Sequence, residues 1–182
     1  VRQEENQRFL KNCNSAAAHA RGEFLILLNN DTTVTEGWLE PLFELFEKPD
    51  VGVVGPKLLF PNGQLQEAGG IIWDDASGWN YGRADDPSRP QYNYVRETDY
   101  VSGAALMIRH SLWRELGGFD ETFVPAYYED TDLCFSARAA GYKVVYQPAS
   151  AVVHYEGMTN GTDLGGGQKQ YQVVNQQRFL EK

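Results

Sequence analysis

Near the start of this 182-residue chain, a carboxylate follows directly on an apolar run. Residues 24–28 read FLILL, and Asn29, Asn30 and Asp31 come next. A short continuous apolar run is typical of a strand covered on both faces, and open parallel sheets bind ligands beyond the carboxyl ends of their strands. Asp31 is therefore a candidate ligand-binding residue at the sheet edge. An Asx-rich turn explains the same residues without any function, and this alternative stays open.

A second acidic group, Glu129-Asp130-Thr131-Asp132, follows the aromatic stretch at residues 123–128. Acids at a helix start complement the helix dipole and cap free N–H groups, which would give Thr131 or Asp132 a purely structural role. Three carboxylates within four residues also repel one another unless a cation or an incoming proton compensates. A general base that takes a proton from a hydroxyl needs such a carboxylate. Glu129 and Asp130 are therefore candidates for acid–base chemistry, with capping as the alternative.

The third polar group is a single histidine, His154, at the end of the apolar segment AVVH. A lone histidine on a strand is usually a structural residue. If its strand lies beside the strand that ends at Asp31, an imidazole and a carboxylate face one crevice. This mixed set of ligands suits manganese better than calcium, and a diphosphate would supply further oxygens.

These groups must be positioned by strands and helices. The pattern of apolar and amphipathic segments predicts an α/β fold with a mainly parallel sheet flanked by helices. Apolar runs predict strands, and amphipathic stretches that end near glycine predict helices. The expected strands are residues 24–28, 51–60, 101–109, 143–148 and 151–156, and the expected later helices are 111–116, 129–140 and 171–180. Residues 74–99 are polar and aromatic without a clear period, and loops of this length are usually functional or disordered.

Composition limits the partners and the compartment. The chain has 25 acidic and 16 basic residues and a formal charge of -9, so we expect no nucleic-acid partner. Cys13 and Cys134 lie far apart without a CxxC spacing, which favours reduced thiols in a cytoplasmic protein. No apolar run is long enough to cross a bilayer. No GxGxxG follows a strand, which disfavours a dinucleotide-dependent dehydrogenase. A nucleotidyltransferase would need a basic glycine-rich loop, and none is visible.

The motifs together resemble a known family. LLNNDTTV and the long stretch VSGAALMIRHSLWRELGGFDETFVPAYYEDTDLCFSARAAGYKVVYQPASAVVHYEG resemble the second half of a family 2 glycosyltransferase of GT-A fold, in the rhamnosyltransferase-like group. The resemblance implies a GT-A-like mixed sheet without its N-terminal nucleotide-binding strands. It assigns residues 1–34 to the end of the nucleotide-binding half, 35–158 to the acceptor and catalytic half, and 159–182 to a flexible loop and C-terminal helix. Glycines within 158–167 could let a lid close over the donor phosphates.

The same resemblance implies roles for individual residues. Asn29, Asn30 and Asp31 correspond to the DxD-type motif that holds a nucleotide-sugar donor through a divalent cation, Mn or Mg, although Asn29 replaces the first aspartate. Asp31 and His154 would be the metal ligands, and Asp130 would be the catalytic base. The acceptor-binding residues would be Glu129, Gly103 and Trp79, the last because aromatic faces stack on sugar rings, with loop packing as the alternative for Trp79.

The predicted function is transfer of a sugar, with inversion, from a nucleotide-diphosphate donor to a saccharide or lipid-linked acceptor in surface polysaccharide synthesis. The alternative is a nucleotide-sugar-binding module without catalysis. Because the chain begins at Val1 in what resembles the middle of a domain, we expect the segment alone to be inactive. We also expect it to self-associate through the unpaired FLILL edge. Peripheral membrane association would come from regions outside the segment.

Overall fold

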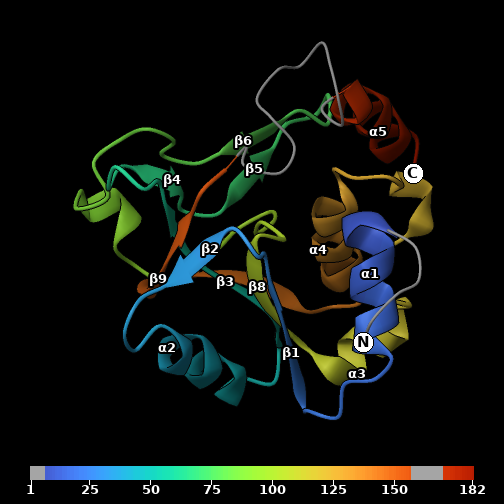
Figure 1. Cartoon of the computed structure of the whole chain (residues 1–182), viewed down its shortest axis with the longest axis horizontal. Helices are drawn as coiled ribbons and strands as arrows, with labels where there is room; N and C mark the ends of the chain where they lie inside the picture. Colours follow the sequence, from blue (N-terminus) through green and yellow to red (C-terminus); the bar gives the residue numbers. More distant parts are fainter. Residues whose placement is uncertain (1–6, 157–169) are drawn as a thin grey trace.

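The computed structural model describes residues 7–156 and 170–182 and shows a mixed β-sheet flanked by helices (Figure 1). The strands are β1 (Phe24–Leu28), β2 (Thr32–Val34), β3 (Val51–Leu59), β4 (Leu65–Glu67), β5 (Gly70–Ile72), β6 (Gly78–Asn80), β7 (Arg96–Glu97), β8 (Ala105–Arg109) and β9 (Lys143–His154). The helices are α1 (Arg8–Ala17), α2 (Leu39–Glu44), α3 (His110–Leu116), α4 (Glu129–Ala139) and α5 (Gln170–Glu181), with short 3₁₀ turns η1 (Leu45–Glu47), η2 (Pro90–Tyr92) and η3 (Glu121–Phe123). The expected lid segment, 158–167, lies outside the described residues.

The larger sheet has the strand order β1-β8-β3-β9-β2, with β4 paired to β3 and β7 paired to β9. Strands β5 and β6 form a separate hairpin. The expected mixed α/β architecture is confirmed. The expectation of a mainly parallel sheet is wrong, because β3–β9 is the one parallel pair among the described strands. An apolar run does not indicate strand direction, because helices can cover antiparallel strands as well as parallel ones.

Strand β1 is an edge strand of the described sheet, which agrees with the unpaired FLILL edge expected from the sequence. Among the described strands it pairs with β8 alone. Leu25 is only 6% exposed, and Leu27 packs against the same core, whereas Ile26 is 38% exposed and Leu28 is 43% exposed. The FLILL run is therefore covered well on one face rather than on both.

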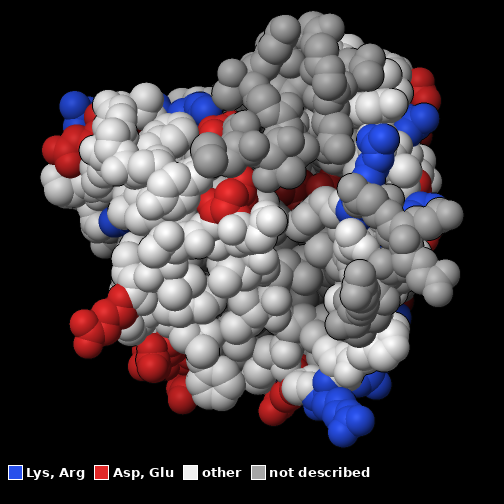
Figure 2. All heavy atoms as spheres, in the orientation of Figure 1, with Lys and Arg blue, Asp and Glu red and all other residues white. Residues whose placement is uncertain are grey.

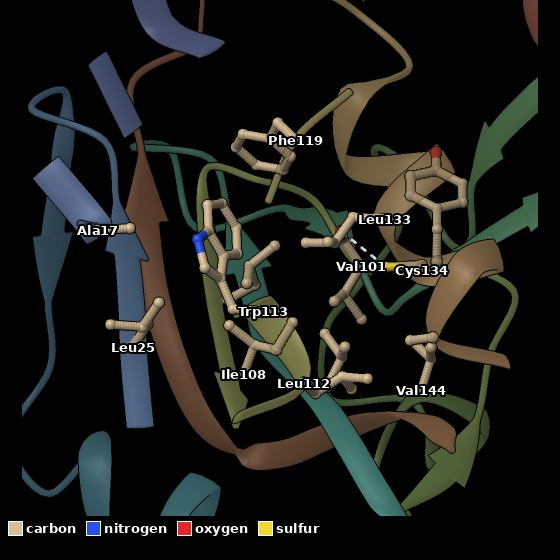
Figure 3. Packing of buried hydrophobic residues seen from close by; sticks show 14 of the residues in the cluster. Ala17, Leu25, Val101, Ile108, Leu112, Trp113, Phe119, Leu133, Cys134 and Val144 are labelled. Atoms are coloured by element: carbon tan, nitrogen blue, oxygen red, sulfur yellow. Dashed lines mark hydrogen bonds between the residues drawn. The ribbon is translucent and has the colours of Figure 1, made fainter. Parts of the chain in front are cut away.

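Helices α1, α3 and α4 lie on one face of the sheet, and α2 lies on the other (Figure 1). On the first face, Trp113 of α3, Leu133 and Cys134 of α4 and Ile108 of β8 belong to one buried cluster (Figure 3). On the second face, the cluster contains Leu42, Leu45 and Phe46. The two cysteines are free thiols, as expected. Within the described ranges, no helix combines the length and apolarity needed to span a bilayer.

Two further segments differ from a simple interpretation of the sequence. Residues 74–99 are ordered and contain β6, η2 and β7; the buried Tyr92 donates its hydroxyl to Asp85 (2.8 Å). The two strands expected at 143–148 and 151–156 form one strand, β9, whose register against β3 shifts after Gln147. Because β9 is continuous, one strand pairs with β3 on one side and with β7 and β2 on the other, and it ends at His154.

Candidate active site

One cavity of about 770 Å³ is lined by every residue that the sequence predicted to bind a substrate or metal or to act as the base. It is lined by the β1–β2 turn, β4, the β5–β6 hairpin, the loop before β8, the start of α4 and the end of β9. The predicted residues among its lining are Asn29, Asn30, Asp31, Trp79, Gly103, Glu129, Asp130 and His154. Figure 2 shows acidic side chains inside a hollow near the middle of this face. The structure therefore brings the three polar groups of the sequence together.

The pairing of β2 with β9 places Asp31 beside His154. Thr32, the first residue of β2, lies opposite His154 in the antiparallel register. The Nε2 atom of His154 lies 3.4 Å from Oδ1 of Asp31, and the two side chains are only 12% and 15% exposed. The turn itself is held by Thr32, whose hydroxyl donates to the carbonyl of Asn29 (2.7 Å), and by the Asn29 N–H, which donates to the carbonyl of Ala104 (2.9 Å).

The hydrogen bonds around His154 define its tautomer. Gln66 donates its amide N–H to Glu156 (3.2 Å), so its Oε1 atom is left to accept from Nδ1 of His154 (3.0 Å). Burial lowers the pKa of His154, although the negative charge of Asp31 acts in the opposite direction. The lowered pKa favours a neutral ring. Nε2 then presents a lone pair to a carboxylate oxygen, and two acceptors face each other.

Two facing acceptors at this separation suit a shared cation, and metal-bound histidines commonly donate their second N–H as Nδ1 does here. Asp31 and His154 thus fit a divalent cation chemically. Across residues 7–156 and 170–182 there is no cluster of three or more His, Cys, Asp and Glu side chains that could hold a metal ion. The remaining ligands would have to come from a bound diphosphate or from water.

Asp130 lies in the first turn of α4 and points at the backbone of the loop before β8. Its Oδ2 accepts the N–H of Gly103 (2.8 Å), and its Oδ1 accepts the N–H of Thr131 (2.8 Å). Burial raises the pKa of Asp130, and the two backbone N–H groups oppose this rise. The side chain remains half-buried and lines the cavity. A carboxylate with a raised pKa that still faces the cavity is a suitable general base.

The capping interpretation of Thr131 and Asp132 is wrong. The N-cap of α4 is Tyr128, whose side chain makes no capping hydrogen bond, and the first-turn N–H of Thr131 donates to Asp130 rather than to Thr131 or Asp132. Asp132 instead accepts a hydrogen bond from Nζ of Lys182 (2.7 Å), which ties the C-terminal end of the chain to α4. The helix begins where the chain leaves a left-handed conformation, so its start is set by the preceding backbone rather than by a cap.

The residues just before the acidic group have unusual backbone conformations. Tyr127 and Tyr128 have φ angles of 76° and 72°, which are uncommon for bulky residues and tend to occur at functional sites. Asn175 of α5 is fully buried and donates its amide to the carbonyls of Ala126 (2.8 Å) and Tyr127 (3.0 Å). The hydroxyl of Tyr128 donates to the carbonyl of Ala76 (2.8 Å). These contacts hold the strained turn that aims Glu129 and Asp130.

Two of the three predicted acceptor-binding residues, Trp79 and Gly103, also lie at the cavity. Trp79 is 44% exposed and packs edge-to-face on Tyr81, with ring centroids 5.7 Å apart. Gly103 allows a close backbone approach, because an added Cβ would lie 3.3 Å from Cβ of Asp130. Their roles toward a substrate remain predictions, as do those of the other site residues.

Two buried glutamates complete the acidic side of the cavity. Glu129 is 6% exposed, and burial together with Asp130 raises its pKa to about 8. Glu67, at the end of β4, is 1% exposed, and burial raises its pKa to about 8 as well. Glu67 was not among the residues predicted from the sequence. The available signal was a glutamate in a short strand, LQE, directly before the turn residues Ala68 and Gly69.

Solved structures of similar shape define the class of fold. GalNAc-T7, solved with UDP, GalNAc and Mn²⁺, matches with a TM-score of 0.69 at 19% identity, over 85% of this chain and 32% of that chain. The mannosyltransferase PcManGT from Pyrobaculum calidifontis, solved with GDP-Man and Mn²⁺, matches with a TM-score of 0.58 at 18% identity, over 85% of this chain and 38% of that chain. At these identities the likeness concerns the fold alone, which is a GT-A-like mixed α/β fold.

The family follows from the sequence. Residues 1–116 match the profile of glycosyl transferase family 2, and the chain belongs to this family. This confirms the resemblance indicated by the motifs.

Curated relatives extend the match beyond residue 116. The O-antigen biosynthesis protein RfbC of Myxococcus xanthus is 34% identical over 158 residues, which is 82% of this chain and 12% of the relative. The pre-mycofactocin glycosyltransferase of Mycobacterium tuberculosis (strain ATCC 25618 / H37Rv) is 32% identical, over 78% of this chain and 28% of the relative. The N-acetylglucosaminyl-diphospho-decaprenol L-rhamnosyltransferase of the same strain is 26% identical, over 78% of this chain and 50% of the relative. The chain therefore spans half or less of the length of these relatives.

Proposed function

We propose that this chain forms the catalytic part of an inverting glycosyltransferase that moves a sugar from a nucleoside diphosphate to a hydroxyl of a saccharide or lipid-linked acceptor. The observation that supports this function best is the shared cavity. It contains a candidate base, Asp130, and a candidate cation pair, Asp31 and His154. A base and a leaving-group site in one cavity are what a single displacement needs.

In this reaction the acceptor oxygen forms a bond to the anomeric carbon while the bond from that carbon to the diphosphate oxygen breaks. The acceptor proton passes to Asp130, whose two backbone hydrogen bonds fix the direction of its carboxylate. A divalent cation held by Asp31 and His154 would supply positive charge to the departing diphosphate. One displacement inverts the anomeric carbon and needs no covalent sugar–enzyme intermediate.

The donor and acceptor classes rest on the proteins to which this chain is similar. The two solved neighbours contain UDP or GDP-Man together with Mn²⁺. One relative is named as an N-acetylglucosaminyl-diphospho-decaprenol L-rhamnosyltransferase, and another is an O-antigen biosynthesis protein. We therefore propose a nucleotide-sugar donor, a Mn²⁺ or Mg²⁺ cofactor and an acceptor used in surface polysaccharide synthesis.

Asp130→Asn tests the proposed base. The assay uses the natural protein to which this chain belongs. There we expect kcat for sugar transfer to fall by about 10²-fold or more, because asparagine cannot take the acceptor proton. The dissociation constant of the nucleotide sugar should change little. Asparagine has one oxygen and keeps one of the two backbone hydrogen bonds, so thermal unfolding must show that the variant is folded.

Asp74→Asn is the matched control, since Asp74 is exposed and does not line the cavity. It should retain wild-type kcat. If Asp130→Asn transferred sugar at the control rate, Asp130 would not be the base. If the wild-type protein bound a nucleotide sugar but transferred it to no acceptor in a broad panel, the chain would be a binding module instead.

A further inference from the structure

Two carboxylates from different elements hold neighbouring amides of one loop. The N–H of Ser102 donates to Oε1 of Glu67 (3.1 Å), and the N–H of Gly103 donates to Oδ2 of Asp130 (2.8 Å). Glu67 ends β4, and Asp130 lies in the first turn of α4. The Ser102–Gly103 backbone is thus fixed from both sides, and a change at Glu67 reaches Asp130 through one residue of loop.

The same loop also contacts the turn that carries Asp31. The hydroxyl oxygen of Ser102 accepts the N–H of Ala104 (3.2 Å), and the carbonyl of Ala104 accepts the N–H of Asn29 (2.9 Å). The loop before β8 therefore lies between the candidate base and the candidate donor motif. Its position affects the distance between the two halves of the proposed reaction.

We infer that Glu67 is a positioning residue for Asp130: through the Ser102–Gly103 loop it fixes the carboxylate that takes the acceptor proton. This inference rests on the proposed function. Glu67 is 1% exposed, so its carboxyl group is too deeply buried to be the base itself. Its effect on the reaction must pass through the residues that it contacts.

The protonation state of Glu67 makes the inference specific. Burial raises the pKa of Glu67 to about 8, so the side chain is mostly uncharged at pH 7. The titratable and charged groups whose electrostatic interactions involve Glu67 come from several elements and are Asp130, Arg83, Glu156, Tyr100, Tyr146 and Cys134. Its Oε2 atom has no hydrogen-bond partner within the described part of the chain. The Ser102 N–H then donates to an uncharged oxygen, and the side-chain oxygen of a glutamine at this position is also an uncharged acceptor.

Two substitutions of similar size separate this role from others. Glu67→Gln keeps the acceptor for the Ser102 N–H and mimics the protonated acid. Glu67→Met keeps the length and volume of the side chain but removes the acceptor, and its apolar chain suits a buried position. At pH 7 we expect Glu67→Gln to retain kcat within about threefold, and Glu67→Met to lose about tenfold or more, because small displacements of a reacting group are costly. KM for the donor should change less than kcat in both variants.

A second measurement does not depend on turnover. Carboxyl-carbon NMR titration of Asp130 should show a higher pKa in Glu67→Met than in the wild type, since a displaced Gly103 N–H stabilises the carboxylate less. Glu67→Gln should leave the Asp130 pKa near the wild-type value. The acid limb of the kcat profile should move with the NMR pKa in each variant. Thermal unfolding confirms that each variant is folded.

The outcomes are distinct. If Glu67→Gln were as inactive as Glu67→Met, Glu67 would act through its negative charge, and the inference would be overturned. It would also be overturned if Glu67→Met kept full kcat and an unchanged Asp130 pKa, because Glu67 would then be only structural. If the wild-type protein transferred no sugar while the NMR shifts appeared as expected, the proposed function would fail, and the link between Glu67 and Asp130 would stand.

Discussion

Glu129→Gln should remove a large part of the pH dependence of folding. Glu129 is 6% exposed, and its Oε2 has no hydrogen-bond partner in the described residues. Burial first, and the neighbouring Asp130 second, raise its pKa from 4.5 to about 8. The folded state therefore binds a proton that the unfolded state releases between these pH values. The stability that this group contributes is fully present below pH 4.5 and is lost as pH rises toward 8.

The size of the effect follows from the two pKa values. One pKa unit corresponds to 1.36 kcal/mol, so a rise from 4.5 to about 8 is worth about 5 kcal/mol over the whole window. Between pH 5.5 and 7.5, the difference in unfolding free energy between wild type and variant should change by about 3 kcal/mol. That is a large fraction of the 5–15 kcal/mol, roughly, that stabilises a typical domain.

Urea denaturation at pH 5.5, 6.5 and 7.5 measures this difference directly. Glu129→Gln should have nearly wild-type stability at pH 5.5 and should be the more stable protein at pH 7.5. Glu40→Gln is the matched control, since Glu40 is an exposed glutamate in the first turn of α2. Parallel stability profiles for wild type and Glu129→Gln would refute the reasoning, because they would mean that Glu129 is hydrated or paired in the folded protein.

Three further predictions concern the metal pair, the C-terminal helix and the edge strand. Asp31→Ala should weaken Mn²⁺-dependent nucleotide-sugar binding by about tenfold or more, and Mn²⁺ should support it better than Ca²⁺; calorimetric binding unchanged by a chelator would contradict this. Asn175→Ala should destabilise the protein by about 1–3 kcal/mol in urea denaturation, because carbonyls before α4 lose their buried donor; an unchanged midpoint would argue against this role of Asn175. Self-association through β1 should show in light scattering and should decrease in Ile26→Lys, which adds a charge to the exposed edge; a strict monomer before substitution would exclude it.

Local features of the sequence were enough to find the candidate site. Asp31 and His154 each terminate an apolar segment, and residues that end neighbouring strands meet at one edge of a sheet. Asp130 lies in an acidic group for which the sequence left two interpretations open, a helix start and an acid–base role. These patterns are local in the sequence, and the residue types in them indicate metal binding and acid–base chemistry.

Strand direction and the exposure of individual residues in β1 were not available from the same patterns. FLILL indicates a strand, but the exposure of Ile26 and Leu28 depends on which elements lie beside β1. Likewise, Thr131 and Asp132 have the types of capping residues, yet the left-handed backbone of Tyr128 sets the start of α4. In both cases contacts distant in sequence decide the outcome, and no window of the sequence contains them.

Glu67 shows the same limit at the site itself, since 63 residues of chain separate it from Asp130 and 35 separate it from Ser102. A glutamate in a short strand between turn residues has the appearance of a solvated position. The fold buries it behind the loop that Asp130 also holds, and its raised pKa is a consequence of that burial. Asp130 could be recognised because its neighbours in sequence are unusual, whereas the residue that positions it could be recognised only from a hydrogen bond to the adjacent amide. A search of related chains for functional residues should therefore include buried acids that share a loop with the base.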